Sequence, residues 1–506
     1  MVDDVSRRGV LLSAGAALSG GIATGIGSGT VTAGTDGRGQ DEVPPVRWHE
    51  TVDNDNMDKL IGIGTAEGQL TVDGYSGVVY ESVDPWAATV DATDGSLRSQ
   101  TRVDVDGQFL TQASAPLAEG GRVFLGRHTE EPDADDATTE PTLVGTNGDG
   151  GTAWRRAFEP PFELFQVTDL AADPTGGAVF VGYSLDIDNP NTWAAAVDAE
   201  GETRWERRLA GFFATFATGI EPTGDGYLVY GNAMRGEQWD FDRQDGWAAK
   251  IGPTGDPQWS ERYRQRSGGG QSEYHRFTDV VETESGYLLV GDLAPSADDA
   301  AARGWAVTVD SDGQRLYTAL DRPGTDGGGE FVAAVPYGDG YALVGSTYRS
   351  EERLVEIPWV RCVDASLSNN WEALDPLGRP AIVRDAVATS DGGVALTGNH
   401  DTVDGWTDPF VAKLGGDPVE TPTPSPTPTP TPTRTPSPTP TATQSSAPTE
   451  SGAQPSTRTP TEADEAAAGP DTTAGDGPGF GVSGALAALC GGTLLSRWRR
   501  EPTDEE

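Results

Sequence analysis

The sequence predicts an all-β protein built from a repeated unit of four short strands, and three observations lead to this. Short runs of β-branched and aromatic residues alternate with turns rich in Gly, Asp and Pro over residues 44–416. This alternation is typical of strands joined by hairpins. The pattern recurs about every 54–58 residues, and the chain holds seven copies. Four strands at such a period predict a seven-bladed β-propeller.

The repeated unit is clearest in residues 193–231, where WAAAVD, TRWERRL, FATGIE and YLVYG follow one another as its first to fourth strands. Copies of the first strand begin at Trp86, Thr142, Trp193, Trp247, Trp305, Trp359 and Phe410. Copies of the fourth strand begin at Gly68, Gly121, Gly177, Gly226, Gly286, Gly340 and Gly393. A second aromatic residue follows in the second strand, at Trp154, Trp205, Trp259, Tyr317 and Trp371. We expect the first-strand tryptophans to pack between blades, and the small residues 194–196 to lie on an inner strand.

The two ends of the repeat predict how the ring closes. The last first strand, residues 410–414, has nothing strand-like after it, and the earliest fourth strand, near Gly68, has no first strand before it. Trp48 stands where a second-strand tryptophan belongs. We therefore expect the N-terminal segment to supply the second to fourth strands of a blade whose first strand is residues 410–414. This interlock would leave no free sheet edge at the closure.

The composition is strongly acidic, with 79 Asp and Glu against 35 Lys and Arg and a net charge of −44. Such a charge repels phosphate backbones, so we expect no nucleic-acid partner. Lysine occurs at only three positions, 59, 250 and 413. An acidic, lysine-poor composition resembles that of proteins from salt-loving archaea. An ordinary acidic secreted protein is the alternative.

Residues 1–33 resemble a twin-arginine signal peptide. Ser6, Arg7 and Arg8 match the motif, an apolar run extends to about residue 26, and small residues at 31–33 suit cleavage. The resemblance implies export of the folded protein by the twin-arginine translocase. A cytoplasmic N-terminal helix is the alternative.

The segments after the propeller suggest a surface anchor. Residues 417–477 are rich in Thr and Pro, which predicts an extended, disordered stalk and resembles O-glycosylated stalks. Pro478, Gly479 and Phe480 then precede a short apolar run and arginines up to residue 500. This order resembles the PGF-CTERM sorting signal of archaeal surface proteins, which implies cleavage by an archaeosortase and a lipid anchor in the membrane. A retained transmembrane helix is the alternative; both place the propeller on the extracellular face of the cell membrane, in the surface layer.

Loop lengths predict a binding face. Turns after first and third strands are short, whereas connections after second and fourth strands are long and dissimilar, and the two sets lie on opposite faces of a propeller. The long loops concentrate Arg and aromatic residues in an acidic chain, which favours an anionic glycan or an envelope protein as partner. The alternative is that these residues pack and pair within the loops. The predicted contact residues are Arg235, Trp239, Phe241, Arg243, Arg262, Tyr263, Arg264, Arg266, Tyr274, His275 and Arg276.

The sequence contains few patterns typical of catalytic or metal-binding sites. The four histidines have no metal-binding spacing, the Asp-rich turns lack a complete calcium loop, and Cys362 and Cys490 are not expected to pair. We therefore expect no metal and no catalytic residue, and we expect Cys362 to be a small buried hydrophobe. The stretch AVDAEGETRWERRL resembles the repeat of PQQ-like and WD40-like propellers over residues 48–415. The adjacent cysteines of quinoprotein dehydrogenases are missing, so no cofactor is implied.

Together these features favour a non-enzymatic binding, adhesion or scaffold module of an archaeal cell envelope. Two alternatives stay open. An extracellular polysaccharide hydrolase or lyase would be favoured by a carboxylate pair facing the central channel. A structural component of the surface layer would be favoured by abundance and self-association.

Overall fold

The computed structural model describes residues 43–416, apart from 53–58, 67, 79–81, 118–119, 131–138, 161–164, 185–190, 210–213, 236–242, 266–273, 295–301, 322–327, 349–355 and 402–406. The predicted signal peptide, stalk and sorting signal therefore lie outside the described residues. Within the described ranges, no helix is long and apolar enough to cross a membrane.

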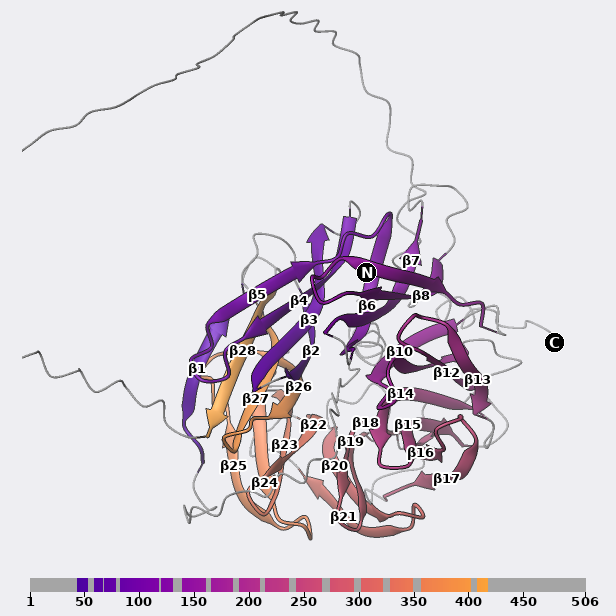
Figure 1. Ribbon diagram of the computed structural model, residues 1–506. Helices are drawn as coiled ribbons and strands as arrows, with labels where there is room; N and C mark the ends of the chain where they lie inside the picture. The colour runs from indigo at the N-terminus through magenta and orange to yellow at the C-terminus, as the bar shows by residue number, and fades with distance from the viewer. Residues whose placement is uncertain are drawn as a thin grey trace, which may run out of the picture. The chain divides into compact units, whose positions relative to one another are not determined.

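Seven antiparallel sheets of four strands form a ring (Figure 1), which confirms the predicted all-β seven-bladed propeller. Written from the axis outward, the sheets are β2 (Lys59–Ala66), β3 (Gln69–Val78), β4 (Ser82–Val90) and β5 (Leu97–Arg102); β6 (Gln108–Pro116), β7 (Arg122–Thr129), β8 (Thr139–Thr146) and β9 (Thr152–Ala157); β10 (Phe165–Ala172), β11 (Ala178–Ser184), β12 (Thr192–Val197) and β13 (Thr203–Leu209); β14 (Thr215–Thr223), β15 (Gly226–Met234), β16 (Gln244–Ile251) and β17 (Pro257–Tyr263); β18 (Tyr274–Thr283), β19 (Gly286–Ala294), β20 (Arg303–Asp310) and β21 (Arg315–Asp321); β22 (Gly329–Tyr337), β23 (Gly340–Tyr348), β24 (Glu356–Val363) and β25 (Asn369–Leu374); β26 (Ile382–Ala388), β27 (Gly393–Asp401), β28 (Thr407–Gly415) and β1 (Val46–Thr51).

Each blade starts at a different point of the repeat from the one the sequence suggested. The third strand of the repeat is innermost, as Figure 1 shows for β10, β14 and β18, and the second strand is outermost. Residues 193–231 therefore span two blades, with β12 and β13 in one and β14 and β15 in the next. The expectation that residues 194–196 lie on an inner strand was wrong, because β12 is third from the axis. A periodic sequence does not mark where a blade begins.

The closing blade joins the two ends of the described chain. β1 pairs antiparallel with β28, with Val46 opposite Leu414 and Thr51 opposite Phe410, which confirms the predicted interlock. The division of strands was wrong, however. The N-terminal segment supplies only the outermost strand of this blade, and β2 and β3 belong to the next blade. The same shift of the repeat explains this difference.

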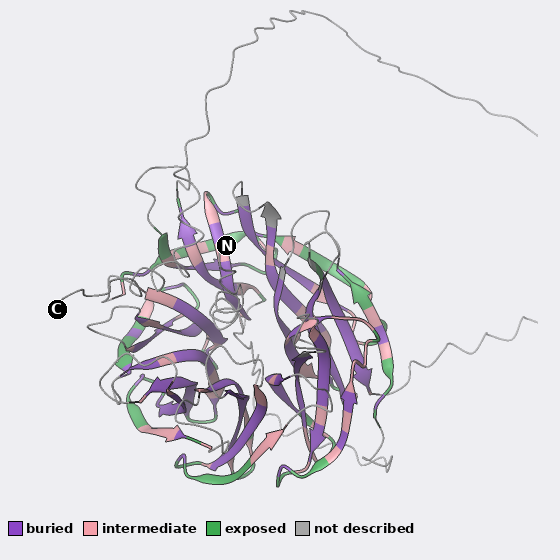
Figure 2. Ribbon diagram, turned by 180° about the vertical axis from the view of Figure 1, so that it is seen from behind, coloured by how far each residue is buried: buried purple, intermediate pink, exposed green. Residues whose placement is uncertain are grey.

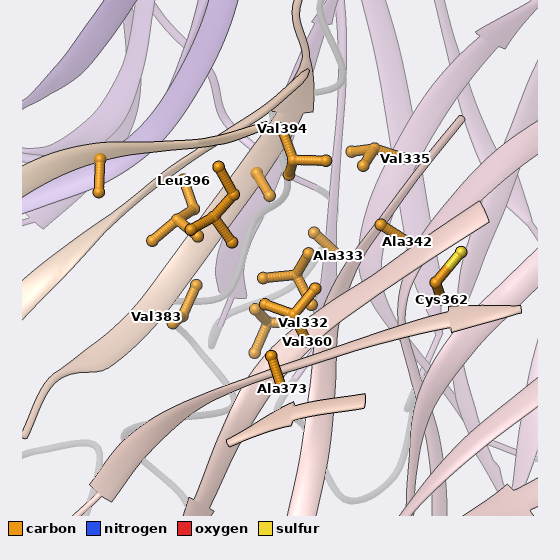
Figure 3. Packing of buried hydrophobic residues seen from close by; sticks show 14 of the residues in the cluster. Val332, Ala333, Val335, Ala342, Val360, Cys362, Ala373, Val383, Val394 and Leu396 are labelled. Atoms are coloured by element: carbon orange, nitrogen blue, oxygen red, sulfur yellow. The ribbon is translucent and has the colours of Figure 1, made fainter. Parts of the chain in front are cut away.

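Packing between blades forms the core, and exposed residues follow the outer strands (Figure 2). The first-strand tryptophans are buried as predicted, with Trp193, Trp247, Trp305 and Trp359 at most 2% exposed. Figure 3 shows a cluster of buried hydrophobic residues between two blades, where Val394 and Leu396 of β27 face residues of β22. Cys362 belongs to the same cluster and is a free, buried thiol, as expected.

At four blade interfaces, the second aromatic residue of the repeat joins a blade to the next one. The Trp205 indole Nε1–H on β13 donates to the carbonyl oxygen of Pro253, 2.9 Å away in the β16–β17 turn. Its ring covers Gly255, which has φ of +77°, and a Cβ there would lie 2.7 Å from the ring. Only glycine suits that position. The same contact recurs where Trp48, Trp154 and Trp259 donate to Ala92, Ala199 and Ser311.

The interface between β21 and the β24–β25 turn is built differently. The turn between β24 and β25 carries Leu367 where other turns carry glycine, with φ of 64°. Leu367 is 6% exposed and packs in a core cluster that Ala319 of β21 borders. On β21, Tyr317 occupies the position of the docking tryptophans and is 53% exposed. A side chain in the turn thus occupies the place that the neighbouring aromatic ring takes elsewhere.

Candidate functional site

Several basic side chains lie close together at strand ends, on the face that carries the long connections. Hairpins β14–β15 and β16–β17 turn on the opposite face, so the end of β15, the start of β16 and the end of β17 meet at one place. Arg235, Asp245, Arg262 and Arg264 come from these three ends. We call the three arginines and Asp245 the arginine cluster.

The cluster holds more positive than negative charge. Asp245 is buried, and its Oδ1 lies 2.6 Å from Arg235 Nε and 3.8 Å from Arg264 Nε. Burial lowers the pKa of Arg262, Asp245 partly opposes this, and the charge of Arg235 lowers it further. Within the described part of the chain, Arg235 and Arg264 thus both pair with the one carboxylate of Asp245. The side chain of Arg264 is 51% exposed, so its guanidinium reaches solvent.

His275 fixes the base of the cluster. Its Nε2 lies 2.8 Å from Gln265 O and 3.1 Å from Gln265 N, and its Nδ1 lies 3.0 Å from Gln244 O. The Arg235 guanidinium is 3.3 Å from the same Nδ1. In either neutral tautomer, one ring nitrogen donates to a carbonyl and the other accepts from an N–H. Burial lowers the pKa of His275, so the ring is neutral and organises the loops.

The structure places the remaining predicted residues in different surroundings. Tyr263 lies in the blade interface, 4% exposed, with its hydroxyl donating to Gly313 O at 2.8 Å. The backbone carbonyl of Arg243 accepts from the amide of Arg235 at 3.0 Å. Trp239, Phe241 and Arg266 lie outside the described residues. Only part of the predicted set is thus brought together at the arginine cluster.

Arg276 and Tyr274 lie closer to the axis, on β18. Arg276 is buried and its guanidinium donates to Asp292 at 2.9 Å and to Glu330 of the next blade at 3.0 Å. Burial alone would lower its pKa, but these carboxylates raise it overall. Burial raises the pKa of Tyr274 to about 12. These pairings could not be predicted from the sequence, because the partner carboxylates lie 16 and 54 residues further along the chain.

A second group of titratable residues lies around the axis. Asp169, Asp279 and Asp385 each follow a bulge in an inner strand, and each Oδ2 accepts a backbone N–H of the next inner strand. The donors are Ile220 at 2.9 Å, Ala334 at 2.7 Å and Ile63 at 3.0 Å. Burial raises the pKa of all three carboxyls, that of Asp279 to about 7. These bonds join neighbouring blades, which is a structural role.

Glu221 on β14 differs from those three aspartates. Burial raises its pKa well above the usual value, and the nearby charges of Asp279 and Asp169 raise it further. Its Oε2 is buried without a hydrogen-bond partner among the described residues. No group of three or more His, Cys, Asp or Glu in the described ranges is arranged to hold a metal ion.

Comparisons with known proteins assign no family to the chain. Neither a protein-family model nor a curated protein sequence matches the chain. A protein of unknown function from Dyadobacter fermentans is 12% identical, with 62% of this chain and 98% of that chain covered and a TM-score of 0.39. The quinohemoprotein alcohol dehydrogenase of Comamonas testosteroni is 10% identical, with 70% and 67% covered and a TM-score of 0.37. A polysaccharide lyase is 10% identical, with 79% and 96% covered and a TM-score of 0.42. Likeness at this level assigns neither a family nor an activity to the chain.

Proposed function

We propose that this protein is a non-enzymatic binding module whose long-loop face takes an anionic glycan or another anionic polymer of the cell envelope. The observation that carries the proposal is the arginine cluster, where Arg235, Arg262 and Arg264 surround the carboxylate of Asp245. A chain with a net charge of −44 repels anions over most of its surface. A local excess of guanidinium groups is therefore a place where a carboxylate or sulfate is attracted.

The chemistry of arginine suits such a ligand. A guanidinium presents five N–H donors in a plane, and a pairing with Asp245 leaves donors for a second oxyanion. Each bond to a charged group contributes about 1.5–3 kcal/mol. Salt screens long-range attraction, so contact bonds at Arg235 and Arg264 would carry the affinity.

The proposal includes a place in the cell. The motif at Ser6, Arg7 and Arg8 supports export through the twin-arginine translocase, and the Pro478-Gly479-Phe480 order supports archaeosortase cleavage and a C-terminal lipid. Mass spectrometry of the native membrane-bound protein tests this. Mature protein should lack residues beyond about 480, and recovery of a peptide containing Trp498 would instead favour a retained helix.

The binding test compares two pairs of arginines. Arg235→Ser with Arg264→Ser should weaken binding to a polyuronate and to a sulfated polysaccharide roughly a hundredfold, since two charged bonds are lost. The control pair is Arg98→Ser with Arg156→Ser, because these exposed arginines lie on the outer strands β5 and β9. Binding that falls equally for both pairs, or for neither, would exclude the arginine cluster. The surface-layer structural role would then become the leading interpretation.

A polysaccharide hydrolase or lyase is the second candidate, and Glu221 is the observation that favours it. A buried carboxyl with a raised pKa is suited to donate a proton as a general acid. The axial aspartates offer no free partner of the kind a glycosidase uses, since backbone amides occupy Asp169, Asp279 and Asp385. Release of reducing ends from envelope polysaccharide by the native protein, and its loss in Glu221→Gln, would establish this candidate over the binding module.

A further inference from the structure

Two histidines meet at the seam where the ring closes. His49 lies on β1 and His400 on β27, on either side of β28, and their Nε2 atoms are 2.9 Å apart. They are 351 residues apart in the sequence. His400 is 2% exposed and His49 is half-buried. Neither residue has a role in the arginine cluster or at the axis.

Neighbouring groups hold both rings in place. The Phe410 ring stacks on His400 with centroids 4.4 Å apart and meets His49 edge-on at 5.5 Å. His400 Nδ1 lies 2.8 Å from the carbonyl oxygen of Pro380. A carbonyl can only accept, so Nδ1 carries the proton and the Nε2 of His400 presents a lone pair toward His49. Histidines that bind metals are oriented by the same kind of bond from the other ring nitrogen.

The spacing of the two Nε2 atoms suits a shared metal ion. Metal–imidazole bonds of about 2.0–2.1 Å place two nitrogens roughly 2.9 Å apart at a right angle and roughly 3.3 Å apart at a tetrahedral angle. The right-angle arrangement is that of square-planar or tetragonal Cu²⁺ and Ni²⁺, for which imidazole is a good ligand. The ring centroids are 5.0 Å apart with an interplanar angle of 72°, so the two nitrogen edges already face one another.

We propose that His49 and His400 form a two-histidine site for Cu²⁺ or Ni²⁺, with water completing the coordination, and that the bound ion fastens the N-terminal strand to the closing blade. Without the ion, the Nε2–H of His49 donates to His400. With the ion, the His49 proton moves to Nδ1, so both Nε2 atoms bind the metal and no net proton is released.

Charges around the site set the conditions for binding. Burial, with smaller contributions from Arg379 and His49, lowers the pKa of His400 to about 4, although the Pro380 carbonyl and Asp408 act in the opposite direction. Burial and Arg379 also lower the pKa of His49. The charge of Arg379 opposes a cation, so Arg379→Ser should tighten metal binding.

The test uses the full chain without a purification tag, treated with a chelator and kept in molar KCl to suppress diffuse binding to carboxylates. Addition of Cu²⁺ or Ni²⁺ should raise the melting temperature by several degrees, because an ion that binds only the folded state stabilises it. Mg²⁺, which prefers oxygen ligands, should not. His49→Gln should abolish the shift. His128→Gln is the matched control and should keep it, since His128 bonds to the Asp106 carbonyl and pairs with no other histidine in the described part of the chain.

A second measurement does not depend on how stable the variants are. The electron paramagnetic resonance spectrum of the Cu²⁺ complex should show coupling to two imidazole nitrogens in the native chain and to one in His49→Gln. A spectrum without nitrogen coupling, or one unchanged by His49→Gln, would refute the site. A melting shift that persists in His49→Gln would refute it as well.

Discussion

Replacement of Trp205 by alanine should destabilise the ring far more than the same change at Tyr317. Both residues occupy the same position of the repeat, on the outer strands β13 and β21. Trp205 is 7% exposed, covers Gly255 and donates to Pro253 at 2.9 Å. Tyr317 is 53% exposed. The two variants therefore compare an aromatic ring that packs on the turn of the next blade with one that is exposed to solvent.

The expected magnitudes follow from burial. Removal of a buried Trp costs about 3–5 kcal/mol, of which the indole hydrogen bond accounts for about 1. Because Tyr317 is exposed, Tyr317→Ala should change the free energy of unfolding by no more than about 0.5 kcal/mol. Trp205→Phe, which keeps most of the ring but loses the donor, should fall between them.

Urea unfolding at fixed KCl concentration, followed by tryptophan fluorescence and circular dichroism, measures these differences. Coincident transitions by both probes are needed before the midpoints are converted to free energies. If Tyr317→Ala costs as much as Trp205→Ala, the contact between outer ring and neighbouring turn is not what stabilises the blade interface.

Four further outcomes are expected. Leu367→Gly combined with Tyr317→Trp should bury the new ring and raise the melting temperature above that of Leu367→Gly alone. Equal melting temperatures would contradict the idea that Leu367 occupies the place of an aromatic ring from the neighbouring blade. Deletion of residues 43–52 removes β1 and should lower the melting temperature and cause aggregation through the exposed edge of β28, whereas an unchanged melting curve would refute the interlock as a stabilising feature. Raising KCl from millimolar to molar should increase the melting temperature, since salt screens a net charge of −44, and a flat curve would count against this repulsion. Burial raises the pKa of Asp279 from 3.8 to about 7, so its contribution is complete below pH 4 and is lost as pH rises through 7; Asp279→Asn should make the fall in stability from pH 4 to 7 shallower, and an identical slope would exclude that titration.

The sequence was sufficient for the number of blades because each blade repeats local signals. A turn that requires glycine and a strand with a buried tryptophan can both be recognised within a few residues, as at Gly255 and Trp247. The point of the repeat at which a blade begins has no such local signal. Which strand is innermost depends on contacts between blades, and the bonds from Asp169 to Ile220 and from Asp279 to Ala334 span 51 and 55 residues.

The candidate site was only partly predictable for the same reason. The surplus of arginines on long loops was visible in the sequence, but the carboxylates that fix them were not. Asp245 precedes Trp247 by two residues and resembles any other strand-entry residue. The meeting of His49 with His400 required the closed ring, since no spacing rule connects residues at opposite ends of the propeller.

The closing blade also has a mechanical consequence. β28 is the last described strand, and it is hydrogen-bonded on both sides, to β27 and to β1. A pull on the chain beyond Gly415 is directed along β28, so it loads the bonds of both ladders together instead of opening them one at a time from a free edge. If the stalk proposed for residues 417–477 anchors the protein, this arrangement would resist drag at the first residue of that stalk.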